Sequence, residues 1–72
     1  MGNPASIFQI TVNGQPRRVP EGTTVADLVR QSGLREDQVA VEVNRRVVRT
    51  ADYGREVAEG DVVELVTFVG GG

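Results

Sequence analysis

The first part of the chain alternates apolar and polar residues with a period of two, which predicts a strand with one buried face. The apolar positions are Phe8, Ile10 and Val12. Asn13-Gly14 follows directly and predicts a tight hairpin, because both residue types accept the positive φ angles of a type I′ turn. The chain should then return over residues 15–19 as an antiparallel strand. Pro16 has no N–H to donate, so this strand is expected at an edge of the sheet.

The spacing of apolar residues then changes to that of a helix. The positions at i, i+3 and i+4 are Val25, Leu28 and Val29. Thr24 stands just before them and Asp27 lies three residues further on, a pair suited to cap the free N–H groups of a helix start. Ser32-Gly33 predicts the end of the helix, because glycine readily takes the left-handed conformation there.

Alternation returns in the second half of the chain and predicts the remaining strands. Residues 39–43 carry valine at every second position, and an apolar run covers residues 62–69. A short strand is predicted at 47–48, and residues 50–53 predict one helical turn capped by Thr50. Tyr53, the single tyrosine, is expected to pack rather than to act as a catalytic phenol. A hairpin, one main helix and three further strands predict an α+β roll built on a small mixed sheet.

The last strand is apolar on both of its faces. If Val63 and Leu65 point towards the helix, the residues that point away are Val62, Val66 and Phe68, alongside Glu64. The opposite parity would expose Val63, Leu65 and Val69 instead. One helix covers only one face of a sheet, so an apolar stripe should lie in the open and serve as a docking surface. The alternative is that these are isolated surface residues without a role.

The composition removes the side chains on which most enzymes rely. The 72 residues include no cysteine and no histidine, which excludes a thiolate nucleophile, the commonest metal ligand and the commonest general base. The net charge of −2 argues against a nucleic-acid-binding module. A chain of this size with these side chains is expected not to be an enzyme and to bind no metal or cofactor of its own.

Neither end of the chain predicts a targeting or membrane segment. The start lacks the basic segment and apolar stretch of a signal peptide, and no apolar run approaches the roughly 20 residues needed to span a membrane. A cytoplasmic protein without membrane binding is therefore expected. Residues 1–6 are predicted to be a flexible leader, residues 7–69 the folded domain and residues 70–72 a flexible tail.

The chain ends on three glycines, Gly70, Gly71 and Gly72. Three residues extend at most about 10 Å, and without Cβ atoms they are thin enough to enter a tunnel. Such a tail can deliver the Gly72 carboxylate to the active site of another protein, with the folded domain as a stop. The alternative is a frayed terminus without a function.

Three segments carry a resemblance to a known family: ITVNGQPRRVPEGTTVADLV, VAVEVNRRVV and EGDVVELVTFVGGG. Their order, their spacing and the terminal Gly-Gly are similar to those of the ThiS family, the small ubiquitin-like sulfur carriers of thiamine biosynthesis. The resemblance covers residues 10–72 in register and without large gaps. It implies the β-grasp fold, which agrees with the predicted order of strands and helix.

The resemblance also implies a chemical role for the tail. In such carriers an E1-like adenylyltransferase of the ThiF type uses ATP and magnesium to adenylate the terminal carboxylate, which here is that of Gly72. A sulfur donor such as a cysteine desulfurase then converts the adenylate into a thiocarboxylate, and a thiazole synthase of the ThiG type takes the sulfur. Val62, Val66 and Phe68 would form the docking surface, with Gly70 and Gly71 leading to the reactive end.

Other roles stay open at this point. A sister carrier on the same fold would supply molybdopterin synthesis or tRNA thiolation, with the same chemistry and another recipient. A ubiquitin-like protein modifier or interaction module would instead form isopeptide bonds with lysines. A plain structural domain would tolerate the loss of the tail.

Overall fold

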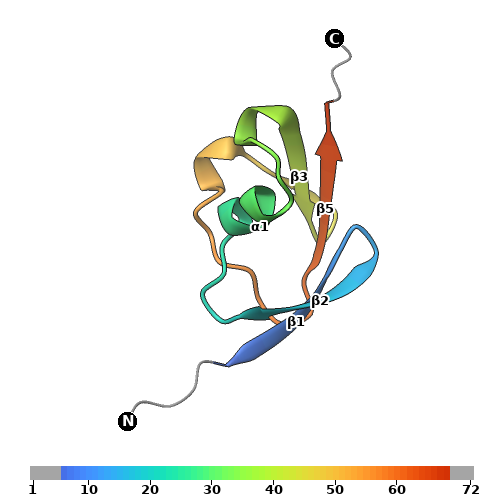
Figure 1. Cartoon of the computed structure of the whole chain (residues 1–72), viewed down its shortest axis with the longest axis vertical. Coiled ribbons are helices and arrows are strands. Elements are labelled where there is room, and N and C mark those ends of the chain that lie inside the picture. The colour runs from blue at the N-terminus through green and yellow to red at the C-terminus, as the bar shows by residue number, and fades with distance from the viewer. Residues whose placement is uncertain (1–5, 69–72) are drawn as a thin grey trace.

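The computed structural model describes residues 6–68, which form a mixed five-stranded sheet with one α-helix packed on one face (Figure 1). The elements in chain order are β1 (Ile7–Val12), β2 (Gln15–Pro20), α1 (Val25–Gln31), the 3₁₀ turn η1 (Glu36–Gln38), β3 (Val39–Val43), β4 (Arg46–Val48), the 3₁₀ turn η2 (Thr50–Asp52) and β5 (Val62–Thr67). The predicted α+β roll is confirmed. The predicted tail, residues 70–72, and all but Ser6 of the predicted leader lie outside the described residues.

The sheet places the last strand at its centre. The strand order is β2-β1-β5-β3-β4, with β5 parallel to β1 and antiparallel to β3. The final strand thus pairs directly beside the first. β2 and β4 are the two edge strands, which confirms the edge position predicted from Pro16.

The first hairpin follows from its turn residues. Asn13 and Gly14 have φ angles of 51° and 81°, and Val12 pairs with Gln15 across the turn. Both angles are those of a type I′ turn, whose twist matches that of the flanking strands. The turn between β3 and β4 uses the same left-handed region at Asn44 and Arg45, with φ angles of 54° and 70°.

Helix α1 begins and ends as the sequence predicts. The Thr24 hydroxyl oxygen accepts a hydrogen bond from the Asp27 N–H at 3.1 Å, and the Asp27 carboxylate accepts one from the Thr24 N–H at 2.9 Å. This reciprocal pair is a capping box. At the other end the Gly33 N–H bonds the Arg30 carbonyl and the Leu34 N–H bonds the Val29 carbonyl, the two bonds of a Schellman motif.

The core lies between α1 and the sheet. The side chains without any exposed surface come from α1, β3 and β5. They are Val25, Leu28, Val29, Val41 and Val63. Burying a side chain of this size stabilises the fold by about 1.5–3 kcal/mol relative to leaving it in water. These residues fix β3 and β5 against the helix, and the opposite face of the two strands is left uncovered by any other described element (Figure 1).

The turn after β4 differs in part from the prediction. Residues 50–52 form one helical turn, but Thr50 is its first residue and no side-chain hydrogen bond caps it. The turn is held instead by the bond from the Tyr53 N–H to the Thr50 carbonyl and by Tyr53 itself. Tyr53 is only 3% exposed, and its hydroxyl donates to the Val39 carbonyl at 3.3 Å. Its packing role is confirmed.

The capping box predicts a pH dependence. The pKa of Asp27 lies below the ordinary 3.8, chiefly because its carboxylate accepts the Thr24 N–H, with smaller contributions from the Thr24 hydroxyl and the Arg30 charge. The folded chain thus favours the ionised form. The resulting stability is fully present above the ordinary pKa and is lost as the pH falls through the lower pKa of the folded state.

Asp27→Asn should therefore weaken the decline of stability at acid pH, as measured by urea unfolding in steps from pH 5 to about pH 2. Asp52→Asn is the matched control, because the Asp52 side chain has no hydrogen bond or ion pair with the described residues. An unchanged acid decline in the Asp27 variant would contradict the assignment.

Candidate functional site

The structure decides which face of β5 is open. Val63 and Leu65 are buried in the core, whereas Val62 and Val66 are 45% and 54% exposed. Phe68, just beyond the strand, is 60% exposed. The predicted docking residues Val62, Val66 and Phe68 are therefore all accessible, because Val63 and Leu65 make the contacts of β5 with the core. Their role in docking stays a prediction.

Strand register extends this open surface across β3 and β4. Val66 stands opposite Ala40, Glu64 stands opposite Glu42, and Glu42 stands opposite Val47. Directly opposed residues in antiparallel strands project to the same side of the sheet. Val47 is 71% exposed, so this side of the sheet is also accessible at the edge strand β4. Seven residues make up this outer face: Ala40, Glu42, Val47, Val62, Glu64, Val66 and Phe68.

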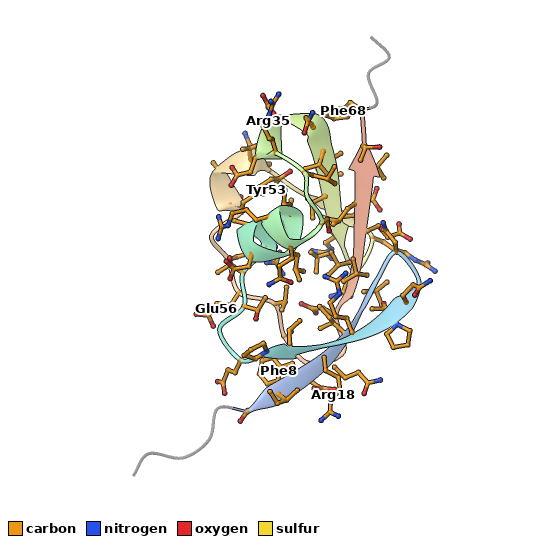
Figure 2. All side chains as sticks on the ribbon, in the orientation of Figure 1. Phe8, Arg18, Arg35, Tyr53, Glu56 and Phe68 are labelled. Carbon is orange, nitrogen blue, oxygen red and sulfur yellow. The ribbon has the colours of Figure 1, made fainter. Side chains whose placement is uncertain are left out.

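Phe68 ends the outer face beside a shallow hollow. Its N–H donates to the Gln38 carbonyl at 2.9 Å, which continues the pairing of β5 with β3 one residue past the strand. The hollow has a volume of about 350 Å³, and its lining includes Phe68, Ala40, Val47 and Tyr53. Figure 2 shows Phe68 at the end of β5, far from Phe8 and Arg18 at the opposite end of the sheet. The chain continues directly from Phe68 towards the three glycines.

Asn13 holds β5 on the side of β1. The Leu65 N–H donates to the Asn13 side-chain oxygen at 2.8 Å, and the Asn13 side-chain amide donates to the Leu65 carbonyl at 3.3 Å. The Asn13 backbone N–H also bonds the Val63 carbonyl. The Asn13 side-chain amide thus makes the two hydrogen bonds with Leu65 that a further backbone residue of β1 would make. Because β1 has already ended at this point, the side chain extends the support of β5 towards Phe68.

Asn44 and Asp61 hold the beginning of β5 on the other side. The Asn44 N–H bonds the Val62 carbonyl at 2.7 Å, and the Val62 N–H bonds the Asn44 side-chain oxygen at 2.9 Å. The Asn44 amide also donates to the Asp61 carboxylate, which in turn accepts the Ala58 N–H. Two asparagines in the left-handed conformation therefore brace the strand from both neighbours.

The Asn13 brace predicts a loss of stability on mutation. Asn13→Gly keeps the positive φ of the turn and removes both side-chain bonds to Leu65, so we expect a loss of about 1–2 kcal/mol in the free energy of unfolding. Asn13→Ala should lose about 1 kcal/mol more, because alanine is strained at a φ of 51°. Urea unfolding measures both. A glycine variant as stable as the parent would show that the brace contributes nothing.

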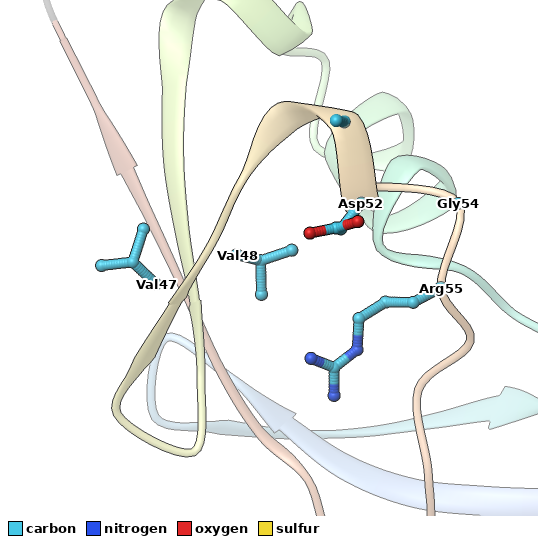
Figure 3. Close-up of a pocket in the computed structure, with 6 residues that line it drawn as sticks. Val47, Val48, Asp52, Gly54 and Arg55 are labelled. Carbon is cyan, nitrogen blue, oxygen red and sulfur yellow. The ribbon is translucent and has the colours of Figure 1, made fainter.

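A second hollow lies beside the edge strand β4. It has a volume of about 400 Å³ and is lined by Val47, Val48, Ala51, Asp52, Gly54 and Arg55 (Figure 3). Asp52 and Arg55 face it with opposite charges, yet no ion pair joins them. Its lining holds one carboxylate and one guanidinium over two valines, without a grouping of nucleophile and base.

The described residues contain neither a cluster of potential metal ligands nor a helix that could cross a membrane. No three metal-ligating side chains of the Asp, Glu, His or Cys type come together between residues 6 and 68. Within the same range, α1 is the one α-helix, and its seven residues fall far short of a membrane span.

The candidate site therefore combines predicted and unpredicted residues. Val62, Val66 and Phe68 are brought onto one surface, while Gly70, Gly71 and Gly72 lie outside the described residues. The bracing roles of Asn13 and Asn44 were not predicted. Both asparagines follow directly after a strand in the sequence, which is the one local signal. The strand that they hydrogen-bond, β5, is distant in sequence, so neighbouring residues do not indicate this partner.

Comparison with known proteins supports both the predicted β-grasp fold and the resemblance to the ThiS family. The family model that matches is that of the ThiS family, over residues 10–72. Among solved structures, the crystal structure of the thiamine biosynthesis protein ThiS from Geobacter metallireducens is similar, with a TM-score of 0.71 and 36% identity. The match covers 90% of this chain and 100% of that one. The β-grasp fold is therefore confirmed.

Two longer relatives are also similar. A thiazole synthase of Magnetococcus marinus is 42% identical over 66 residues, and one of Paramagnetospirillum magneticum is 35% identical over 66 residues. Each match covers 90% of this chain but 20% of the relative. The chain thus spans about a fifth of the length of the curated relatives it matches.

Proposed function

Because the chain belongs to the ThiS family, we propose that it is a sulfur carrier that bears a thiocarboxylate on Gly72 and supplies sulfur for thiazole formation in thiamine biosynthesis. The observation that carries the proposal is the family match, which extends from the first strand through the terminal glycines. The chain itself acts as a co-substrate rather than as an enzyme. An E1-like adenylyltransferase, a sulfur donor and a thiazole synthase are its proposed partners.

The loading reaction begins at the Gly72 carboxylate. A carboxylate oxygen attacks the α-phosphorus of ATP, pyrophosphate leaves, and an acyl-adenylate forms in the active site of the adenylyltransferase. ATP and magnesium belong to that enzyme. Activation is needed because a carboxylate is a poor electrophile until its oxygen becomes part of a good leaving group.

Sulfur then replaces AMP. The terminal sulfur of a donor persulfide attacks the acyl carbon, and AMP leaves with the electrons of the broken C–O bond. The product is an acyl disulfide, in which one sulfur is bonded to the acyl carbon of Gly72 and the other to the donor protein. A second thiol attacks the sulfur that is attached to the donor. A new disulfide forms there, and the other sulfur leaves with Gly72 as the thiocarboxylate. The 72 residues contain no cysteine, so they supply neither the persulfide nor the second thiol.

The folded domain positions this chemistry. Four residues separate Phe68 from the end of Gly72 and extend at most about 14 Å, so the domain must dock close to the partner's active site. The outer face offers four exposed apolar side chains for that contact, Val47, Val62, Val66 and Phe68. The asparagine braces hold the strand that leads into the tail, which keeps the starting point of the tail fixed relative to the docking surface.

The thiazole synthases among the relatives support the proposed recipient. In each of them about a fifth of the chain is similar to this protein, and the remainder belongs to a protein named for thiazole synthesis. A carrier-like segment and a thiazole synthase therefore occur in one polypeptide in these relatives. This favours a thiazole synthase as the partner over the recipients of sister carriers.

The proposal is tested by reconstitution. The chain is incubated with a ThiF-type adenylyltransferase, ATP, magnesium, cysteine and a cysteine desulfurase, and its intact mass is measured. We expect the mass change of one oxygen replaced by sulfur, absent when ATP is omitted. Addition of thiazole synthase with its substrates should then restore the original mass. No change in mass in a mixture that loads a ThiS protein of known activity would overturn the proposal.

A further inference from the structure

Two glutamates stand directly opposite each other in the middle of the outer face. Glu42 on β3 pairs in register with Glu64 on β5, and both project away from the helix. Among the described residues the ion pairs are Arg30–Asp27 and Arg35–Asp37, so neither glutamate has a cationic partner. Like charges directly opposite on neighbouring strands destabilise a sheet. The free domain therefore carries an arrangement that a neutral residue at either position would improve.

Apolar side chains surround this pair. Val62 and Val66 precede and follow Glu64 on the same side of β5, and Val47 lies next to Glu42 on β4. Register places Arg18 on this side of the sheet, but Arg18 lies on β2, two strands away from β5. Arg49 lines the hollow beside Ala40, Val47 and Phe68, and it forms no ion pair with either glutamate. Two negative charges thus occupy the centre of the outer face, whose other five residues, Ala40, Val47, Val62, Val66 and Phe68, are apolar.

A purely apolar partner does not fit such a surface. Covering it would remove two carboxylates from water without compensation, which is costly unless a cation accompanies the contact. A second copy of this chain does not fit either. In a two-fold symmetric contact the same patch meets itself, so four carboxylates would converge. The complementary partner has to bring positive charge to the centre of the contact and apolar groups to its edge.

Resting on the proposed function, we propose that the adenylyltransferase binds the outer face by placing an arginine guanidinium between Glu42 and Glu64, with apolar side chains over Val62, Val66 and Phe68. The Cβ atoms of opposed residues lie about 5 Å apart, so one guanidinium can reach both carboxylates. Its planar set of five N–H donors bonds two carboxylates at once, whereas a lysine ammonium is a single point of charge. The contact also removes the repulsion between the two glutamates.

This arrangement makes stability and binding change in opposite directions. The Glu42→Gln/Glu64→Gln double variant should raise the Tm of the free domain by about 1–5 °C, because the repulsion is gone. The same variant should bind the ThiF-type adenylyltransferase about 10- to 100-fold more weakly, and its affinity should depend less on salt. Calorimetric titration at two ionic strengths and a thermal melt measure these effects.

Glu21→Gln/Glu56→Gln is the matched control. It changes the net charge by the same amount at two exposed glutamates, one in the turn after β2 and one beside the start of α1 (Figure 2 labels Glu56). We expect its affinity to stay within about twofold of the parent. Equal weakening in both double variants would show a general effect of net charge and would overturn the proposal, as would parental affinity in the Glu42/Glu64 variant.

The arginine itself is identified from the enzyme side. Each arginine and each lysine near the docking surface of the adenylyltransferase is replaced by methionine, and binding of each enzyme variant to the parent carrier and to the Glu42/Glu64 variant is measured. One replacement should weaken binding of the parent carrier and have little further effect on the Glu42/Glu64 variant, the sign of a coupled pair. Coupling to a lysine alone, or to no cation, would contradict the proposal. Failure of the parent carrier to bind or to acquire sulfur would instead contradict the proposed function.

Discussion

Deletion of Gly72 is expected to abolish the loading of sulfur while the domain stays folded. The reactive group of the proposed carrier is the carboxylate of the last glycine, and removal of one residue shortens the reach of the tail by about 3.5 Å. A displacement of that size takes the carboxylate out of attack geometry, where misplacement by about 1 Å already costs about 100-fold in rate. Intact mass after reconstitution measures the loaded fraction, and circular dichroism with a thermal melt measures the fold.

Gly70→Ala is the control for this deletion, because it alters the tail but keeps its length and the Gly71-Gly72 end. It should retain most of the loading. A Gly72 deletion that still acquires sulfur at the parental yield would refute the role of the terminal carboxylate. Loss of loading together with loss of the thermal transition would point to unfolding instead and would contradict the expected separation of tail and fold.

Phe68→Asp should weaken binding to the adenylyltransferase by about 100-fold or more and change the stability of the free domain little. The ring is 60% exposed, so the folded domain gains little from it. In a docked complex the ring would be covered by the partner, and an aspartate in its place would bury an uncompensated charge. Calorimetric titration against the enzyme and urea unfolding of the free variant separate the two effects.

Ile7→Asp is the matched control for Phe68. Ile7 is an exposed apolar residue of similar accessibility, 49%, but it lies at the start of β1, at the opposite end of the sheet. Its variant should bind the enzyme as the parent does. If the two variants bind alike, the docking surface does not include Phe68. If Phe68→Asp loses stability in proportion to binding, the residue supports the fold rather than the contact.

Local features of the fold could be predicted because their causes lie within a few residues. The Asn13-Gly14 turn and the capping box at Thr24 each depend on neighbours in sequence, and both have the predicted geometry. The turn at residues 50–53 shows the limit of this reasoning. Thr50 resembles a cap locally, but the turn is anchored by Tyr53, whose hydroxyl bonds a carbonyl of β3 fourteen residues away in sequence.

The candidate site depended on contacts that a sequence pattern does not contain. The run from Val62 to Val69 is apolar at both parities, so only packing against α1 could show that Val63 and Leu65 are the buried pair. The Asn13 brace joins residues 52 positions apart. The opposition of Glu42 and Glu64 likewise requires the register of β3 against β5.

The two edge strands have a consequence for self-association. An exposed sheet edge is a template on which another chain can add a strand and start fibrous growth. Here one edge strand, β2, contains Pro16 and Pro20, which donate no backbone hydrogen bond, and the other, β4, is three residues long. Neither edge offers a long uninterrupted row of donors and acceptors. The domain can therefore expose valines and a phenylalanine on its face at high concentration without nucleating cross-β aggregates from its edges.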